Sequence, residues 1–297
     1  MKNMRRLIVT GASGFVAGHV LAEAADSWEA HALTREVPKK CGRGAIWHSC
    51  EAASDLANFI RELHPKAVIH TAAIADIDFA EKNRQLAWEV NVSLTKRLAE
   101  LCAETRCKMV LCSTDTVFGG EHAPYSEQAP TDPLNYYAET KVEAERHAAA
   151  LGDQAVIARL ALVVGIPVFG TGNSFLARTL AAFEEGREIS APAHEIRSPV
   201  DVVTAARALV ELAAGNHHGI FHLAGHTRIN RFAMMKMIAN KFGFPEARIV
   251  AQPPGSTPGR AARPRDVSLD NTKVSVQLKT PMRTLDEGLS MFISGSA

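Results

Sequence analysis

Residues 7–17, LIVTGASGFVA, decide the fold of this 297-residue chain. They begin with a short apolar run that is typical of a buried parallel strand, and a helical pattern starts near Phe15. Between the two, Gly11 permits a tight turn, and Gly14 lets a pyrophosphate approach the amino end of the helix. Ala17 is the small residue at which such a helix packs on its strand. This pattern predicts a dinucleotide-binding unit, although glycine turns also occur in other α/β proteins.

Strand and helix patterns alternate through the first half of the chain. Further apolar runs predict strands at about 29–34, 46–47, 67–70, 109–112 and 155–164. Amphipathic segments predict helices at about 16–25, 54–63, 88–105 and 136–151. This alternation indicates a doubly wound, Rossmann-type parallel sheet in an α/β protein.

The regular alternation of strand and helix patterns ends at about residue 165. Helices are predicted at about 174–185, 199–212 and 230–242, with one more strand at 219–223. We therefore expect residues 1–165 to form a dinucleotide-binding domain, which is completed by about 196–224. Residues 166–195 and 225–297 are expected to form a smaller C-terminal substrate lobe.

The composition excludes several classes of protein. Lys and Arg together number 33 against 32 Asp and Glu, so charge gives no reason to expect nucleic acid or an anionic membrane as a partner. No apolar stretch reaches transmembrane length, and the first apolar run is too short for a signal peptide. The five cysteines lack zinc-type spacing. We expect reduced thiols in a cytoplasmic protein, and no metal site.

The sharpest chemical signal is Tyr137-x-x-x-Lys141. This spacing puts the phenol and the ammonium on the same face of a helix. A free phenol titrates near pH ~10, and the lysine together with an oxidised nicotinamide ring is expected to lower that pKa, so that Tyr137 can exchange a proton with a substrate oxygen. Lys141 can also hold the nicotinamide ribose. An ordinary amphipathic helix is the alternative, but a predicted strand ending in Ser113-Thr114 adds a hydroxyl near the same place.

Four segments carry a family resemblance. They are STDTVFGG at 113–120, PLNYY at 133–137 with Lys141, the span 72–91 with its Ala-Ala, Asp-x-Ala-Glu and Asn elements, and RPRDVSLD at 263–270. In this order they resemble the extended short-chain dehydrogenase/reductases, and most closely the dTDP-4-dehydrorhamnose reductase branch. The resemblance runs nearly from end to end of the chain.

The resemblance implies an NADP-dependent reductase of a keto sugar nucleotide or a related carbonyl. Thr114 would hydrogen-bond the substrate carbonyl, Tyr137 would be the general acid, and Lys141 would orient the ribose and tune Tyr137. The late arginines, at 260, 263 and 265, would face either a substrate diphosphate or solvent. The residues expected to bind the cofactor are Gly11, Ser13, Gly14, Phe15, Val16, Thr34, Arg35, Ala72, Ala73, Ile74, Asn91, Ser113, Tyr137 and Lys141.

The end of the second predicted strand bears on the choice of cofactor. Domains that prefer NAD commonly have an acidic residue there, which binds the ribose 2′-hydroxyl, whereas this chain has Thr34 followed by Arg35. The guanidinium of Arg35 suits a 2′-phosphate and can stack on adenine. We predict NADP(H) over NAD(H). NAD(H) remains the alternative, because a shift of one residue in register would bring Glu36 closer.

Departures from the branch leave other activities open. Thr116 stands where the branch usually has a tyrosine near the sugar, and Asp115-Thr116 replaces the Asp-Glu pair of the 4,6-dehydratases. One alternative is a sugar-nucleotide epimerase with tightly bound NAD. Another is a non-catalytic, cofactor-binding regulatory subunit, because the regulatory subunit of methionine adenosyltransferase resembles the same branch. The retained Thr, Tyr and Lys favour an enzyme acting on a nucleotide sugar. The apolar helices after the fourth and fifth predicted strands are expected either to pair in a homodimer or to bury their apolar stripes within their own domain.

Overall fold

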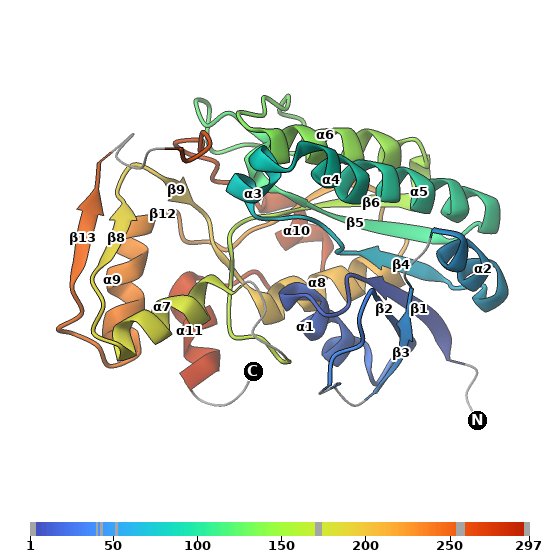
Figure 1. Ribbon diagram of the computed structural model, residues 1–297, viewed down its shortest axis with the longest axis horizontal. Coiled ribbons are helices and arrows are strands. Elements are labelled where there is room, and N and C mark those ends of the chain that lie inside the picture. Colours follow the sequence, from blue (N-terminus) through green and yellow to red (C-terminus); the bar gives the residue numbers. More distant parts are fainter. Residues whose placement is uncertain are drawn as a thin grey trace.

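The computed structural model describes residues 4–39, 41, 44–50, 53–169, 174–253 and 259–293, and its centre is a seven-stranded sheet. The strands are β1 (Arg5–Thr10), β2 (Trp28–Thr34), β3 (Ala45–Ser49), β4 (Ala67–His70), β5 (Lys108–Thr114), β6 (Ala155–Leu160) and β11 (Gly219–Leu223). Their order is β11-β6-β5-β4-β1-β2-β3, and every neighbouring pair is parallel (Figure 1). The predicted Rossmann-type parallel sheet is confirmed.

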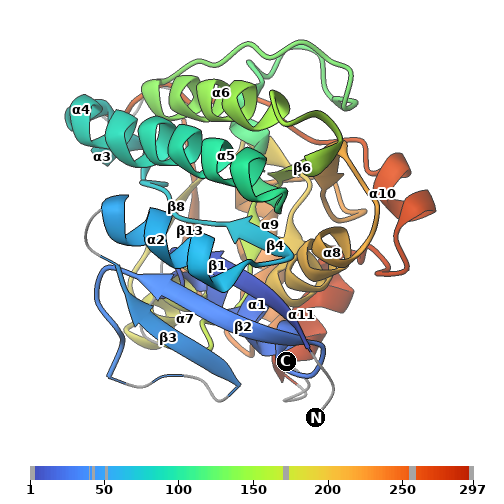
Figure 2. The same cartoon turned by 90° about the vertical axis from the view of Figure 1, so that its right-hand side faces the viewer.

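Helices cover both faces of this sheet, as Figure 2 shows. One face carries α1 (Phe15–Ala24) and α8 (Val202–Ala214), and the other carries α2 (Ala53–Leu63), α5 (Leu94–Thr105) and α6 (Tyr136–Ala149). Side chains alternate between the faces along each strand: Leu7 and Val9 of β1 pack under the first pair of helices, and Ile8 packs under the other three. A strand that is buried on both faces has no polar side, which explains why these strands are apolar runs in the sequence.

The order of the strands reverses between β1 and β4, and the loops after these two strands meet there. Gly11 follows β1 with a φ of 66°, and a Cβ at this position would lie 2.6 Å from the Cα of Ala72, just after β4. The backbone conformation and the close approach both require glycine. In open α/β sheets, ligands bind in the crevice at such a switch point, outside the carboxyl ends of the strands.

Most of the elements after β6 gather beside one end of the sheet, on the left in Figure 1. The helices α7 (Phe175–Glu184), α9 (Arg231–Lys241) and α11 (Leu285–Ile293) share one apolar cluster. The small sheets there pair β8 (Ile189–Pro192) with β13 (Ile249–Gln252), β9 (Ile196–Arg197) with β12 (Ile229–Asn230), and β7 (Val163–Val164) with β10 (Val200–Asp201). A last helix, α10 (Thr272–Gln277), instead packs on the main core through Val274. The predicted domain boundaries stay a prediction.

Three predicted elements differ in the structure. The helix expected over 88–105 is interrupted: α4 (Arg84–Trp88) passes through a π-helical turn at Glu89–Ser93 into α5, and a separate α3 (Ile77–Lys82) precedes it. The strand expected over 155–164 divides into β6 and β7, because Leu162 turns to accept a hydrogen bond from Val200. Pro199 does not open α8; Asp201 caps this helix, accepting from the N–H of Thr204 at 2.8 Å.

None of the helices in the described ranges is long and apolar enough to span a membrane.

Candidate active site

The amino end of α1 lies at the crevice and is free of acidic side chains. Gly14 caps the helix without a side chain, and no acidic residue lies in the first turn. Ser13 and Gly14 are exposed, and Phe15 and Val16 are half-buried. The positive end of the helix dipole is therefore available to a phosphate, and this end of α1 fits the pyrophosphate of a dinucleotide.

The end of β2 lies beside the same loop. Thr34 is the last residue of this strand, as predicted, and its Oγ1 lies 3.1 Å from both Ser13 Oγ and the carbonyl oxygen of Glu36. The next residue, Arg35, is exposed, and within the described residues its guanidinium has no hydrogen bond or ion pair. An exposed guanidinium at this position fits a ribose 2′-phosphate.

Asn91 holds the segment that follows β4. Its Oδ1 accepts from the N–H of Ile74 at 2.8 Å, and its Nδ2 donates to the carbonyl of Ile74 at 3.2 Å and to Thr140 Oγ1 at 3.0 Å. Asn91 is buried within the π-helical turn, a geometry that often marks functional sites. Asn91 therefore joins the segment Ala72-Ala73-Ile74 to α6.

The structure brings Thr114, Tyr137 and Lys141 together at the carboxyl end of β5. Thr114 ends this strand, and its hydroxyl is in hydrogen-bonding contact with the phenol of Tyr137 at the start of α6. Lys141 lies one turn further along α6, and its Nζ donates to the carbonyl of Cys112 at 2.7 Å. All three side chains are buried. The three predicted catalytic residues thus share one site.

The predicted lowering of the Tyr137 pKa, which requires the oxidised nicotinamide ring as well as Lys141, stays a prediction. Burial raises the pKa of Tyr137 well above its usual range, although the hydrogen bond from Thr114 opposes the rise. A raised pKa keeps the proton on the phenol, which is the state that a general acid requires.

Ser113 points away from Thr114, to the opposite side of β5. Its hydroxyl donates to the carboxylate of Glu145, which forms a buried ion pair with Arg159 at 2.7 Å. This buried network occupies the Ser113 side chain. Only its backbone is left for the cofactor contact that the sequence predicts.

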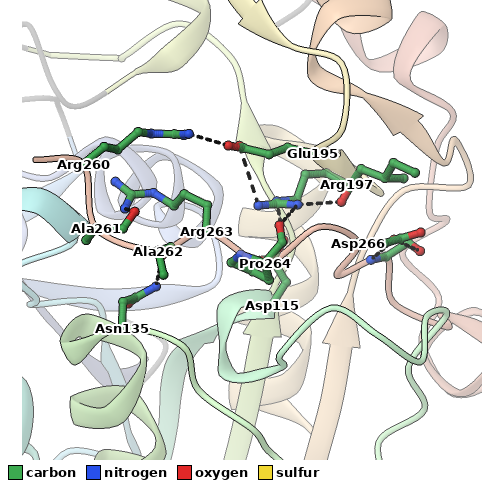
Figure 3. A network of polar contacts seen from close by, with 12 residues as sticks. Asp115, Asn135, Glu195, Arg197, Arg260, Ala261, Ala262, Arg263, Pro264 and Asp266 are labelled. Carbon is green, nitrogen blue, oxygen red and sulfur yellow. Dashed lines mark hydrogen bonds and ion pairs between the residues drawn. The ribbon is translucent and has the colours of Figure 1, made fainter. Parts of the chain in front are cut away.

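A chain of charged groups, shown in Figure 3, leads from Asp115 to Arg197, Glu195 and Arg260. Asp115 follows Thr114, and its Oδ2 lies 4.0 Å from Nε of Arg197. A guanidinium nitrogen of Arg197 lies 3.9 Å from Glu195, and this buried carboxylate accepts from Arg260 at 2.6 Å. Arg260 is therefore held by an ion pair rather than solvated in a basic loop.

Arg231 adds a further cation to this network. It begins α9, and its guanidinium lies 4.5 Å from the centre of the Phe175 ring. Burial lowers the pKa of Arg231 to about 10, and its buried Nε has no hydrogen-bond partner within the described residues. Sequence analysis does not single out Arg231, Arg197 or Glu195. They lie far from Thr114 along the chain and belong to no motif.

The loop that contains Ala262 and Arg263 is hydrogen-bonded to the start of α6. Asn135 caps α6, and its Nδ2 donates to the carbonyl of Ala262 at 3.0 Å. Arg263 donates to Asp78 of α3 at 2.9 Å, whereas Arg265 is exposed. The loop therefore helps to place the helix that carries Tyr137.

A cavity of about 430 Å³ opens next to this network. The buried Nδ1 of His194 has no hydrogen-bond partner among the described residues. The cavity is lined by Ala193, His194, Ile196, Ala251, Gln252, Pro253 and Arg265.

Known proteins match this chain over nearly its whole length. A family model described as RmlD substrate binding domain matches residues 4–297. The dTDP-4-dehydrorhamnose reductase of Mycobacterium tuberculosis (strain CDC 1551 / Oshkosh) is 30% identical over 301 residues, covering 98% of this chain and 93% of that protein. Methionine adenosyltransferase 2 subunit beta of Xenopus tropicalis is 28% identical over 292 residues, covering 94% and 85%.

Among solved structures, the dTDP-4-dehydrorhamnose reductase (rfbD) of Bacillus anthracis str. Ames, in complex with NADP, superimposes with a TM-score of 0.87. The two chains are 23% identical, and the match covers 98% of this chain and 99% of that one. The fold is therefore shared over nearly the whole chain. From the match of the family model and the 30% identity to the mycobacterial relative, we conclude that this chain belongs to the RmlD substrate binding domain family.

Proposed function

We propose that this protein is an NADPH-dependent reductase of a keto sugar nucleotide, of the dTDP-4-dehydrorhamnose reductase kind. The observation that carries the proposal is the meeting of Thr114, Tyr137 and Lys141 in one buried site at the carboxyl end of β5. The relative at 30% identity bears the name of this activity, which supports the same conclusion.

Each site residue has a separate role in the reduction of a carbonyl group. Bound NADPH supplies a hydride to the carbonyl carbon. Tyr137 donates its phenol proton to the carbonyl oxygen, which becomes the hydroxyl of the product, and the resulting phenolate regains a proton from water. Thr114 donates a hydrogen bond to the same oxygen and so stabilises the negative charge that develops on it. Lys141, whose Nζ donates to the carbonyl of Cys112, would orient the nicotinamide ribose beside Tyr137.

The charged network supports a substrate that carries a diphosphate. Among the described residues, the carboxylates that face the guanidinium groups of Arg197, Arg231 and Arg260 are those of Glu195 and Asp115, so these five groups carry one positive charge in excess. An anion placed here would gain charge-assisted hydrogen bonds, including one from the unpartnered Nε of Arg231. The adjacent cavity provides room for the rest of a nucleotide sugar.

The experiment that tests the function mixes the purified protein with NADPH and a panel of keto sugar nucleotides that includes dTDP-4-dehydrorhamnose. We expect loss of NADPH absorbance with at least one of them, and the corresponding reduced sugar as product. An epimerase would interconvert sugars without net consumption of NADPH. Tight NADPH binding without consumption on any member of the panel would favour a regulatory subunit and contradict the proposal.

The choice of cofactor is tested at Arg35. Arg35→Ala should weaken NADPH binding by about 1–3 kcal/mol, because a charge-assisted hydrogen bond to the 2′-phosphate is lost, and should leave NADH binding nearly unchanged. Calorimetric titration of both cofactors measures this. Lys39→Ala, which removes an exposed positive charge a few residues further on, is the matched control and should change little. Equal losses for the two cofactors with Arg35→Ala would show that this arginine does not read the 2′-phosphate.

We expect the protein to act in the cytoplasm, because all of its cysteines are free thiols. A homodimer is also proposed, since Phe79, Leu86 and Trp88 expose apolar surface on α3 and α4. Light scattering of the purified protein measures the mass in solution and decides between monomer and dimer.

A further inference from the structure

Thr116 lies directly against the hydroxyl of Thr114. It belongs to the 3₁₀ turn Asp115–Val117 after β5, and its side chain is buried. Its N–H donates to Thr114 Oγ1 at 3.2 Å, and the two hydroxyl oxygens are 3.0 Å apart. In the part of the chain that the structure describes, the Thr116 hydroxyl has no other hydrogen bond.

A neighbouring carboxylate sets the direction of the bond between the two hydroxyls. Thr114 Oγ1 lies 3.2 Å from Asp115 Oδ1. The guanidinium of Arg197 lies 4.0 Å from Asp115 Oδ2 and opposes the rise in the pKa of Asp115 that burial causes, so it favours the ionised carboxylate, which can only accept. Thr114 has a single proton, which is shared between two acceptors, the Asp115 carboxylate and the phenol oxygen of Tyr137. The donor between the two threonines must then be Thr116.

Thr114 consequently accepts two hydrogen bonds, one from the N–H and one from the O–H of Thr116. A hydroxyl oxygen has two lone pairs, so both are occupied and only its proton remains to interact with other groups. Hydrogen bonds in a chain polarise one another, which makes the Thr114 hydroxyl a stronger donor.

We propose that Thr116 is a positioning residue of the reaction: its hydroxyl donates to Thr114 and thereby directs the single proton of Thr114 to the substrate carbonyl. As negative charge develops on the substrate oxygen, the Thr114 proton turns from Asp115 and Tyr137 to that oxygen. This inference rests on the proposed reductase function. The branch that this chain resembles usually has a tyrosine at the position of Thr116. The inference therefore assigns a role to a residue at which this chain differs from that branch.

The test compares Thr116→Val, which keeps the shape and removes the hydroxyl, with Thr116→Ser, which keeps the hydroxyl. We expect Thr116→Val to lower kcat about 3- to 10-fold, in the range for loss of one neutral hydrogen bond. KM and the Kd of NADPH should stay unchanged, and Thr116→Ser should retain most of the wild-type kcat. A fall in kcat that Thr116→Ser shares equally would indicate a packing role and overturn the proposal.

A double-mutant cycle separates action through Thr114 from any other effect. If Thr116 works only by way of Thr114, adding Thr116→Val to Thr114→Val should cause no further loss of kcat. An equal loss in both backgrounds would overturn the inference, as would an unchanged kcat for Thr116→Val in an enzyme whose wild type turns over. A wild type without turnover on the panel of sugars would overturn the proposed function itself, and this inference with it.

Discussion

Replacement of Tyr137 by phenylalanine is expected to lower kcat by about 10²- to 10⁴-fold, the range typical of a lost general acid. The ring stays in its buried position, and only the proton donor to the substrate oxygen is removed. NADPH binding should therefore remain nearly intact. Single-turnover consumption of NADPH, together with a separate titration of the cofactor, measures both quantities.

The neighbouring Tyr136 offers a matched control on the same helix. Its ring lies 4.7 Å below the guanidinium of Arg84, and its backbone N–H is bound by Glu81, so it belongs to the outer side of the site. Tyr136→Phe removes the same hydroxyl group and should leave kcat within a factor of about two, because no side-chain hydrogen bond of the Tyr136 hydroxyl is present among the described residues. An unchanged kcat in Tyr137→Phe would exclude this residue as the acid.

The second large effect concerns stability, at the loop between β1 and α1. Gly11→Ala should destabilise the fold, because a left-handed backbone costs an alanine about 1–2 kcal/mol and the new Cβ would meet the backbone of Ala72 at 2.6 Å. Relief of that contact should cost about 1–3 kcal/mol more, as in other overpacked sites. Urea denaturation measures the loss.

Gly152 separates the two causes. It has a φ of 57°, close to that of Gly11, but a Cβ there would find nothing within 4 Å. Gly152→Ala should therefore show the conformational cost alone. Equal destabilisation by the two substitutions would mean that the close approach between Gly11 and Ala72 adds nothing to the free energy lost. The geometry assigned to the cofactor crevice would then be incorrect.

Features that depend on neighbouring residues could be predicted from the sequence. The unit β1–turn–α1 follows from an apolar run and two glycines within a few residues, and β2 ends at Thr34 as its pattern indicates. Thr114, Tyr137 and Lys141 could be named because each stands in a short motif. Their assigned roles stay predictions.

Features that depend on tertiary packing could not be predicted. The rise of the Tyr137 pKa comes from burial, which the i, i+4 spacing to Lys141 does not reveal. The ion pairs of Glu195 join residues from separate segments, and no periodicity points to them. The π-helical turn around Asn91 was predicted as ordinary helix, because its apolar stripe continues through the turn.

The central claim is that this chain transfers a hydride from NADPH to the carbonyl carbon of a keto sugar nucleotide. The most direct measurement uses NADPH that carries deuterium at the transferable position of its nicotinamide, with dTDP-4-dehydrorhamnose as substrate. Mass spectrometry and proton NMR of the product should show one deuterium on the former carbonyl carbon, formed with the wild type and nearly absent with Tyr137→Phe. A product without deuterium, or equal labelling rates for the two proteins, would contradict this account.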